Sequence, residues 1–373
     1  MRLLTILVAF SLTAFAQRHS VSEVDAEKPD GKILQQIMQA DDQAKRTALL
    51  EQFVDQFPKA DATPWALEQL LAGYAKSNQP DKVLSIGEKL LAVDPEETEA
   101  ALQCLKAGEA KHDPELVKKY STLASTLARK MIAEPQPKDD ELVDTWKQEV
   151  SYATQVDAYC EYSLYRAFVE SRDPKVTLEF GELLPQRYPK GQYSGKLDNA
   201  MFLAYRQAGQ EAKAVSLAEK VLATDQSNED MLLVVADNYL QNKKEPEKVH
   251  VYCAKLVEIM SAKPKPEGVA DDAWAARKNT VIGVAHYMNG KLYFNENRFS
   301  QADQELRLSL PFVETTPASK GEVLFLLGFS NYNLKKPQEA ANFYRSCAAV
   351  KSDYQAKAAK NLQVIKTEFS GIK

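Results

Sequence analysis

Apolar residues recur along this chain at the spacing of helix faces. Phe180, Leu183 and Leu184 stand at i, i+3 and i+4, and similar sets follow one another through most of the sequence. Side chains three and four residues apart share one face of a helix, so this pattern predicts amphipathic helices. The alternation of apolar and polar residues that is typical of strands is missing. We therefore expect an all-α protein of about seventeen helices.

The apolar pattern repeats itself at a period of 34 residues. Tyr205 and Tyr239 are 34 residues apart, and so are Val83 and Val117. Self-similarity of this length indicates helix pairs stacked in an array, in which each pair buries its apolar face on its neighbours. A length of 373 residues, more than one compact core usually holds, agrees with an extended array.

One stretch shows the signature of the repeat clearly. Tyr293 follows Gly290 by three residues, and Ala302 follows Tyr293 by nine. Small residues let the two helices of a hairpin approach closely, while a tyrosine fills the gap to the next hairpin. This signature resembles the tetratricopeptide repeat (TPR). The resemblance implies a right-handed superhelical solenoid of antiparallel helix pairs.

The other repeats match this signature only in part. Asn331 stands at the tyrosine position of the last repeat, and Phe202 fills a small-residue position. The stretch between Tyr239 and Val249 is one residue longer than the same stretch of the other repeats. A second regularity is a proline that opens the second helix of a pair, at Pro80, Pro114, Pro174, Pro246 and Pro337. Proline loses no hydrogen bond at the first helical position, and an aspartate before it can cap the helix.

Two proline-rich stretches, 134–140 and 261–268, divide the predicted array into blocks. We expect a flexible N-terminal segment at 17–31, repeat blocks at 32–133, 141–261 and 270–353, and a C-terminal capping helix within 354–373. A cap is expected because the last repeat of an array has no neighbour to cover its apolar face.

The first sixteen residues differ from the rest. Met1 and Arg2 precede an apolar run that ends in Ala14-Phe15-Ala16. A short apolar run before a small-x-small site is typical of a secretory signal peptide, so residues 1–16 predict export to the periplasm or the extracellular space, in a bacterium. A retained membrane anchor is the alternative, although the run is shorter than the ~20 residues of a spanning helix. No later stretch predicts stable membrane insertion.

The composition narrows the classes of partner. The net charge is -5 and both signs are scattered along the chain, so the basic patch of a nucleic-acid binder is missing. Four cysteines, Cys104, Cys160, Cys253 and Cys347, lie far apart in apolar helical patterns. Because a repeat touches only its neighbours, we expect these cysteines to be free and buried rather than paired.

The chain lacks the motifs that mark catalytic, nucleotide and metal sites. G-x-x-x-x-G-K-[ST], G-x-G-x-x-G, H-E-x-x-H and G-x-S-x-G are all missing from the sequence. The histidines, His19, His112, His250 and His286, are scattered, with no pair at metal-ligand spacing. Acidic pairs such as Glu96-Glu97 fall at helix starts, where negative charge is favourable. We expect no enzyme, no cofactor and no metal site.

Aromatic residues form the candidate binding surface. Phe325, Phe329 and Tyr332 stand at i, i+4 and i+7, which places them on one helix face. The opposite face carries its own apolar set, so we expect the aromatic face to be surplus to packing. In TPR proteins the first helix of each pair lines a concave groove. With that resemblance, the predicted partner-binding residues are Tyr165, Tyr287, Lys291, Phe294, Phe325, Phe329 and Tyr332.

The resemblance implies a non-catalytic scaffold that binds a protein or peptide partner through the concave face of the solenoid. An exported binder of glycans or small molecules is the alternative, because aromatic planes stack on sugars. Some TPR proteins hold a peptide terminus in a clamp of lysine and asparagine. The corresponding positions here are Glu68, Leu102, Glu161, Asn199, Leu233, Tyr287 and Phe325, so a receptor for chaperone tails is not expected.

Overall fold

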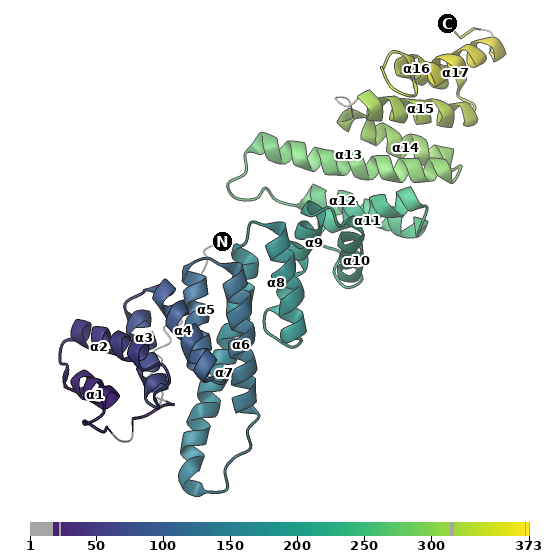
Figure 1. Cartoon of the computed structure of the whole chain (residues 1–373). Helices are drawn as coiled ribbons and strands as arrows, with labels where there is room; N and C mark the ends of the chain where they lie inside the picture. The colour runs from purple at the N-terminus through teal and green to yellow at the C-terminus, as the bar shows by residue number, and fades with distance from the viewer. Residues whose placement is uncertain (1–17, 22–23, 314–316, 370, 373) are drawn as a thin grey trace. The chain divides into compact units, whose positions relative to one another are not determined.

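The computed structural model describes residues 18–21, 24–313, 317–369 and 371–372. In this part of the chain there are seventeen α-helices, two short 3-10 helices and no strand (Figure 1). The all-α prediction is thus confirmed. The leader predicted at 1–16 lies outside the described residues.

The chain divides into two compact units, and the boundary lies between Ala204 and Tyr205, within α9. Up to this division the elements are α1 (Pro29–Gln39), α2 (Gln43–Gln56), α3 (Thr63–Lys76), α4 (Pro80–Val93), α5 (Thr98–Ala110), α6 (Pro114–Ile132), α7 (Asp140–Glu170), α8 (Pro174–Arg187), η1 (Ser194–Lys196) and α9 (Asp198–Gln207). The second unit continues with α10 (Glu211–Leu222), α11 (Glu229–Asn242), α12 (Pro246–Ala262), α13 (Asp271–Asn295), α14 (Phe299–Ser309), η2 (Leu310–Phe312), α15 (Pro317–Asn333), α16 (Pro337–Ala348) and α17 (Gln355–Glu368).

Within each unit a helix packs mainly on the next helix along the chain. The hairpins are α3 with α4, α5 with α6 and α7 with α8 in the first unit, and α11 with α12, α13 with α14 and α15 with α16 in the second. Short turns make the two helices of a hairpin antiparallel neighbours. First helices of successive hairpins also touch, α3 with α5 and α13 with both α11 and α15. The fold is therefore an all-α, TPR-like solenoid, as predicted, and its right-handed sense stays a prediction.

The same backbone turn closes five of these hairpins, all but α7 with α8, and it also joins α9 to α10. The residue four positions after the tyrosine position of the repeat is left-handed: Asn78, His112, Gly209, Lys243, Asn297 and Lys335. The next N–H donates to the carbonyl of the tyrosine position, which belongs to Tyr74, Gly108, Tyr205, Tyr239, Tyr293 and Asn331. This is the hydrogen bond of a Schellman-type helix end, and it satisfies a carbonyl that the helix leaves free.

The turn between α11 and α12 holds one residue more than the others. In the other five turns the second helix begins six residues after the tyrosine position, whereas α12 begins seven residues after Tyr239. The additional residue is Glu245, which has a φ of 45° and lies directly before Pro246. The extra residue predicted between Tyr239 and Val249 is thus confirmed and located.

Proline opens the second helix of five hairpins, as predicted, at Pro80, Pro114, Pro174, Pro246 and Pro337. The carboxylate of Asp113 accepts hydrogen bonds from the N–H groups of Glu115 and Leu116, and that of Asp173 accepts one from Lys175. Aspartate therefore caps α6 and α8. Gln79, Glu245 and Lys336 precede their prolines without a side-chain cap.

Small residues lie where the helices of a hairpin are closest. A Cβ atom on Gly290 would lie 2.8 Å from Cγ of Leu306, and Ala302 is fully buried. The departure from the signature at Asn331 also has a structural reason. Asn331 is fully buried, and its amide donates to Oδ1 of Asp303 at 2.6 Å and to the carbonyl of Leu327 at 2.9 Å.

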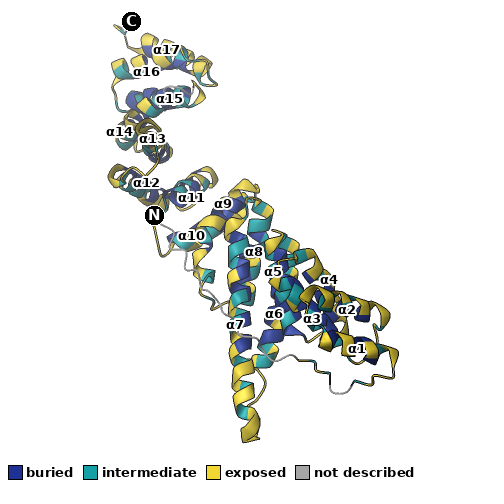
Figure 2. Ribbon diagram, turned by 90° about the vertical axis from the view of Figure 1, so that its left-hand side faces the viewer, coloured by how far each residue is buried: buried dark blue, intermediate teal, exposed yellow. Residues whose placement is uncertain are grey.

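The compact units do not coincide with the predicted blocks. The proline-rich loops before α7 and α13 join helices that pack on each other, α6 on α7 and α12 on α13. The predicted flexible segment 17–31 includes the start of α1 at Pro29. At the other end, α17 packs on α16 and buries Ala358 and Ile365, which is the position of a cap. Figure 2 shows that the N-terminal half of α7 is exposed, while its C-terminal half is buried among its neighbours.

All four cysteines are free and buried, as predicted. Burial raises the pKa of both Cys104 and Cys160 to about 12, so these side chains are thiols at neutral pH. Among the described helices, none has both the length and the apolar content needed to cross a bilayer.

The left-handed turns give a prediction for stability. Lys335 has a φ of 60°, a conformation that costs a residue with a Cβ atom about 1–2 kcal/mol and glycine almost nothing. Replacing Lys335 by glycine removes this cost, and part of the gain in stability is offset because glycine has more freedom in the unfolded chain. We expect Lys335→Gly to raise the free energy of unfolding by about 0.5–1 kcal/mol in urea titrations. Lys335→Ala removes the same exposed side chain but keeps the Cβ atom, and it should bring no gain. Equal stability of the two variants would contradict the assignment of strain to this turn.

Candidate functional site

Two of the predicted binding residues, Tyr287 and Lys291, form a polar link between α13 and α15 through Glu322. The hydroxyl of Tyr287 donates to Oε2 of Glu322 at 2.8 Å, and the ammonium of Lys291 lies 2.9 Å from Oε1 of the same carboxylate. Lys291 also donates to the Tyr287 hydroxyl at 3.0 Å. Burial raises the pKa of Tyr287 to about 12. Although burial alone would raise the pKa of Glu322, its hydrogen bonds to Lys291 and Tyr287 hold it below the ordinary value.

Aromatic contacts continue this link along α15. The Phe329 ring lies 5.3 Å from that of Phe294 and 6.0 Å from that of Phe299, measured between centroids. These edge and tilted arrangements are the favourable ones for aromatic pairs. Phe329 thus ties α15 to the end of α13 and the start of α14.

The remaining aromatic residues of this face, Phe325 and Tyr332 on α15, contact the helices that follow. The ring of Phe325 lies 5.6 Å from that of Tyr344 and 5.1 Å from that of Tyr354. The hydroxyl of Tyr332 donates to Oε2 of Glu368 at 2.8 Å. The expectation that this face is surplus to packing is therefore wrong, because its half-buried side chains connect each hairpin to the next.

Tyr165, the one predicted residue in the first unit, belongs to a cluster of four tyrosines. Its ring stacks on that of Tyr193, with centroids 4.2 Å apart and planes at 11°. Tyr162 lies 6.3 Å from Tyr193 and 6.4 Å from Tyr159. Tyr162 keeps 42% of its surface exposed. We refer to Tyr159, Tyr162, Tyr165 and Tyr193 as the tyrosine cluster.

A pocket of about 250 Å³ lies beside the tyrosine cluster, between the α5–α6 turn and the α7–α8 turn. Its wall combines apolar and charged side chains. The lining residues are Glu109, His112, Asp113, Pro114, Val117, Ser163, Arg166, Ala167, Glu170, Ser171, Arg172, Asp173 and Val176. The pocket therefore has the size and mixed lining of a site for one side chain or a small ligand.

Glu109 connects the pocket to the tyrosine cluster. Its Oε2 accepts a hydrogen bond of 2.6 Å from the hydroxyl of Tyr159, while its Oε1 is buried without a hydrogen-bond partner. The other carboxylates of the pocket are engaged. Asp113 and Asp173 cap helices, and Glu170 accepts from Nε of Arg166 at 3.1 Å. Glu109 and Ser163 thus each bring to this wall a buried side-chain oxygen without a hydrogen-bond partner among the described residues.

Two parts of this site could not be predicted from the sequence. Tyr193 lies in the loop before η1, where no helical period marks the face to which a side chain belongs. The pocket is formed by two turns that are about 60 residues apart in the chain, and their proximity is a property of the stacked hairpins. The tyrosine pattern on α7 was the one feature that could indicate this region from the sequence.

Two solved structures resemble the chain at low overall similarity. The TPR domain of P58(IPK) has 14% sequence identity, a TM-score of 0.26 and coverage of 92% of this chain and 100% of its own. Yeast Tom70 has 13% identity, a TM-score of 0.25 and coverage of 93% of this chain and 78% of its own. No family model and no curated protein sequence matches the chain. The TPR-like assignment therefore rests on the hairpins and turns described above.

The aromatic contacts of α15 give a second prediction. We expect Phe329→Ala to lower the free energy of unfolding by about 1–3 kcal/mol, because the half-buried ring loses its contacts with Phe294 and Phe299. Urea unfolding measures the change. Leu308→Ala is the control, since Leu308 is 53% exposed and should tolerate the truncation. A Phe329→Ala variant as stable as the parent would contradict the packing role of Phe329 and would favour the earlier expectation that its ring is surplus to packing.

Proposed function

We propose that the chain is a non-catalytic interaction scaffold, and that the first unit binds an extended peptide segment of a partner protein. The observation that carries the proposal is the tyrosine cluster beside the charged pocket. Tyrosines present a large rigid surface with a polar end, and they are enriched among the residues that dominate binding energy. In the second unit the aromatic residues hold neighbouring hairpins together, so the proposed surface is that of the first unit.

The pocket supports a basic side chain as the anchor of the peptide. Oε1 of Glu109 lacks a hydrogen-bond partner, and a lysine or arginine of the partner would supply the donor. Apolar atoms of Pro114, Val117 and Val176 line the same pocket and suit the aliphatic stem of such a side chain. The exposed ring of Tyr162 then contacts the residues that flank the anchor.

A glycan is the second candidate ligand, because sugars stack on tyrosine rings. The exposed surface of Tyr162 favours it. One face of Tyr165 is already covered by the parallel ring of Tyr193, so less aromatic surface is left for a sugar there. We therefore place the peptide first and make glycan binding an outcome of the test.

The proposal predicts a defined peptide preference. A random peptide library selected on the purified chain should enrich sequences that carry lysine or arginine next to apolar residues. For an enriched peptide, Tyr162→Ala combined with Tyr165→Ala should weaken binding by about 2 kcal/mol, because both rings belong to the proposed binding surface of the chain. Isothermal titration with the enriched peptide measures this loss.

Two further variants make the test specific. Glu109→Gln keeps an acceptor for Tyr159 but removes the charge, so it should reduce the preference for basic peptides. Tyr332→Ala removes a tyrosine of the second unit and should leave peptide affinity unchanged. Failure to enrich any sequence, or equal binding by the double tyrosine variant, would refute the peptide proposal. Selective binding on a glycan array would instead favour the second candidate.

We further propose that the protein is exported. The support is the leader pattern of residues 1–16 with its Ala14-Phe15-Ala16 site. Mass spectrometry of the protein from its own cells should find an N-terminus near Gln17 in the periplasmic or extracellular fraction. A chain that retains Met1 in a membrane fraction would show that the leader is a membrane anchor.

A further inference from the structure

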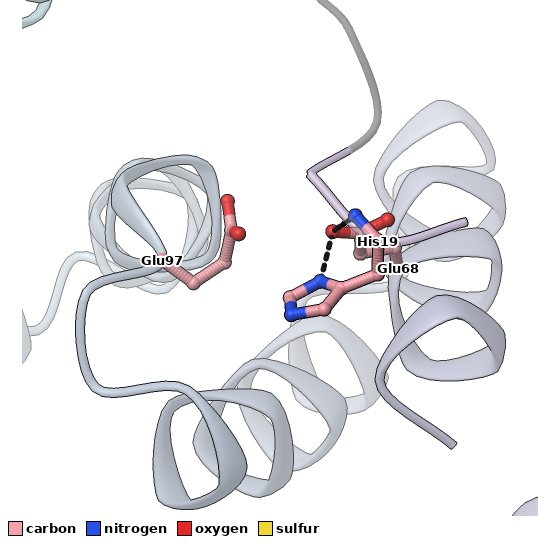
Figure 3. Close-up of side chains that lie close together, drawn as sticks. All are labelled: His19, Glu68 and Glu97. Atoms are coloured by element: carbon pink, nitrogen blue, oxygen red, sulfur yellow. Dashed lines mark hydrogen bonds and ion pairs between the residues drawn. The ribbon is translucent and has the colours of Figure 1, made fainter. Parts of the chain in front are cut away.

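A cluster of one imidazole and two carboxylates lies near the N-terminus, away from the tyrosine cluster. His19 comes from the segment before α1, Glu68 from α3, and Glu97 from the residue that caps α5 (Figure 3). One ligand atom of each side chain lies within 4.8 Å of the other two. Figure 3 shows the Glu97 carboxylate pointing toward the side where His19 and Glu68 meet. Within the described residues, this is the one place where three side chains of metal-ligating type converge so closely.

His19 and Glu68 are already held together. Nδ1 of His19 lies 2.6 Å from Oε1 of Glu68, and the backbone N–H of His19 donates to the same oxygen at 3.3 Å. Nε2 of His19 lies 3.4 Å from Oδ2 of Asp94, which adds a third carboxylate next to the ring. Each ring nitrogen of His19 thus lies beside a carboxylate oxygen, Nδ1 beside Glu68 and Nε2 beside Asp94.

Glu97 is buried with an oxygen that has no hydrogen-bond partner among the described residues. The residue is 6% exposed, and one carboxylate oxygen accepts from the N–H of Glu99 at 3.2 Å. The other oxygen, Oε2, is buried without a hydrogen-bond partner, and so is Oε2 of Glu68. A buried carboxylate without a partner is costly unless a cation or a donor compensates it.

The nearest cation of the protein is engaged elsewhere. Nε of Arg18 lies 2.9 Å from Oδ2 of Asp94, and its Nη2 lies 3.6 Å from a carboxylate oxygen of Glu96. Arg18 also donates to the backbone carbonyl of Glu96. His19 contacts Glu68, and Arg18 acts on Glu97 through its charge without a hydrogen bond to it. A divalent cation would give the buried oxygens of Glu68 and Glu97 a direct partner.

We propose that His19, Glu68 and Glu97 bind a divalent transition-metal ion of the zinc class. Neutral imidazole nitrogen and carboxylate oxygen are both ordinary zinc ligands. The imidazole favours zinc over magnesium, which prefers oxygen ligands and retains its water. No residue of the tyrosine cluster or its pocket takes part, so the site is independent of the proposed peptide binding.

The ion would fasten the N-terminal segment to the hairpins. Glu68 and Glu97 lie on successive first helices or their caps, while His19 lies on a segment that reaches α1 only at Pro29. A metal ion that takes one ligand from each of these three segments restrains all of them at once. Its affinity depends on pH, since the ligands must lose their protons before they bind.

Two other histidine–carboxylate pairs provide natural controls. Nδ1 of His286 lies 2.7 Å from a carboxylate oxygen of Glu305, and Nε2 of His250 lies 3.3 Å from one of Glu296. Within the described residues neither pair has a third ligating side chain at comparable distance. A simple ion pair and the proposed metal site can thus be compared in the same molecule.

The test is zinc titration of the purified protein with a tag that contains no histidine. Isothermal titration near neutral pH should show one zinc ion per chain and no comparable binding of magnesium. His19→Ala and Glu97→Gln should each weaken zinc binding by more than about tenfold, since loss of even an outer-shell partner costs 10–100-fold. His286→Ala should bind zinc as the parent does.

A second readout separates metal binding from an ordinary ion-pair contact. Zinc should slow trypsin cleavage after Arg18 in the parent and in His286→Ala, but not in His19→Ala or Glu97→Gln. Circular dichroism should confirm that all variants keep the helices of the parent. The proposal is overturned if the parent binds no zinc, if His19→Ala binds it as tightly as the parent, or if His286→Ala loses as much affinity as His19→Ala.

Discussion

The architecture depends on one backbone hydrogen bond that recurs at the hairpin turns. A residue in the left-handed conformation turns the chain, and the next N–H reaches back to the carbonyl of the tyrosine position, as from Gln79 to Tyr74 or from Lys336 to Asn331. The second helix then starts at a fixed distance and returns along the first. Because the hairpins with this turn share one geometry, small residues of the repeat lie at the helix contact, as do Gly290 and Ala302.

Stacking of these hairpins decides what each aromatic side chain can do. Phe329 and Phe325 point along the array and meet the rings of neighbouring helices, so they contribute to the cohesion of the second unit. On α7, Tyr159 bonds to Glu109 of α5, whereas Tyr162 and Tyr165 meet Tyr193 of a loop and Tyr162 stays exposed. The same residue type thus serves packing in one unit and forms a candidate binding surface in the other.

The acidic residues at helix starts show how one side chain can have two roles. Glu97 caps α5 through one oxygen, as the sequence pattern indicated, and directs the other toward His19 and Glu68. Capping needs a single acceptor, so the second oxygen is left to the surroundings. A structural interpretation of the acidic pair was therefore correct for the helix and incomplete for the cluster.

The sequence by itself determined the helical repeat, because helix periodicity, the 34-residue spacing and the proline-opened helices are local patterns. It also indicated an extra residue between Tyr239 and Val249, which the structure places at Glu245, and it indicated the buried, unpaired cysteines. Only the tertiary structure decided that Phe325 and Phe329 are packed, that Tyr193 stacks on Tyr165, and that His19 meets Glu68 and Glu97. The physical reason is that these contacts join residues 19 to 78 positions apart, and their distance depends on how hairpins stack and on where the segment before α1 lies. Neither property is encoded in the period of one helix.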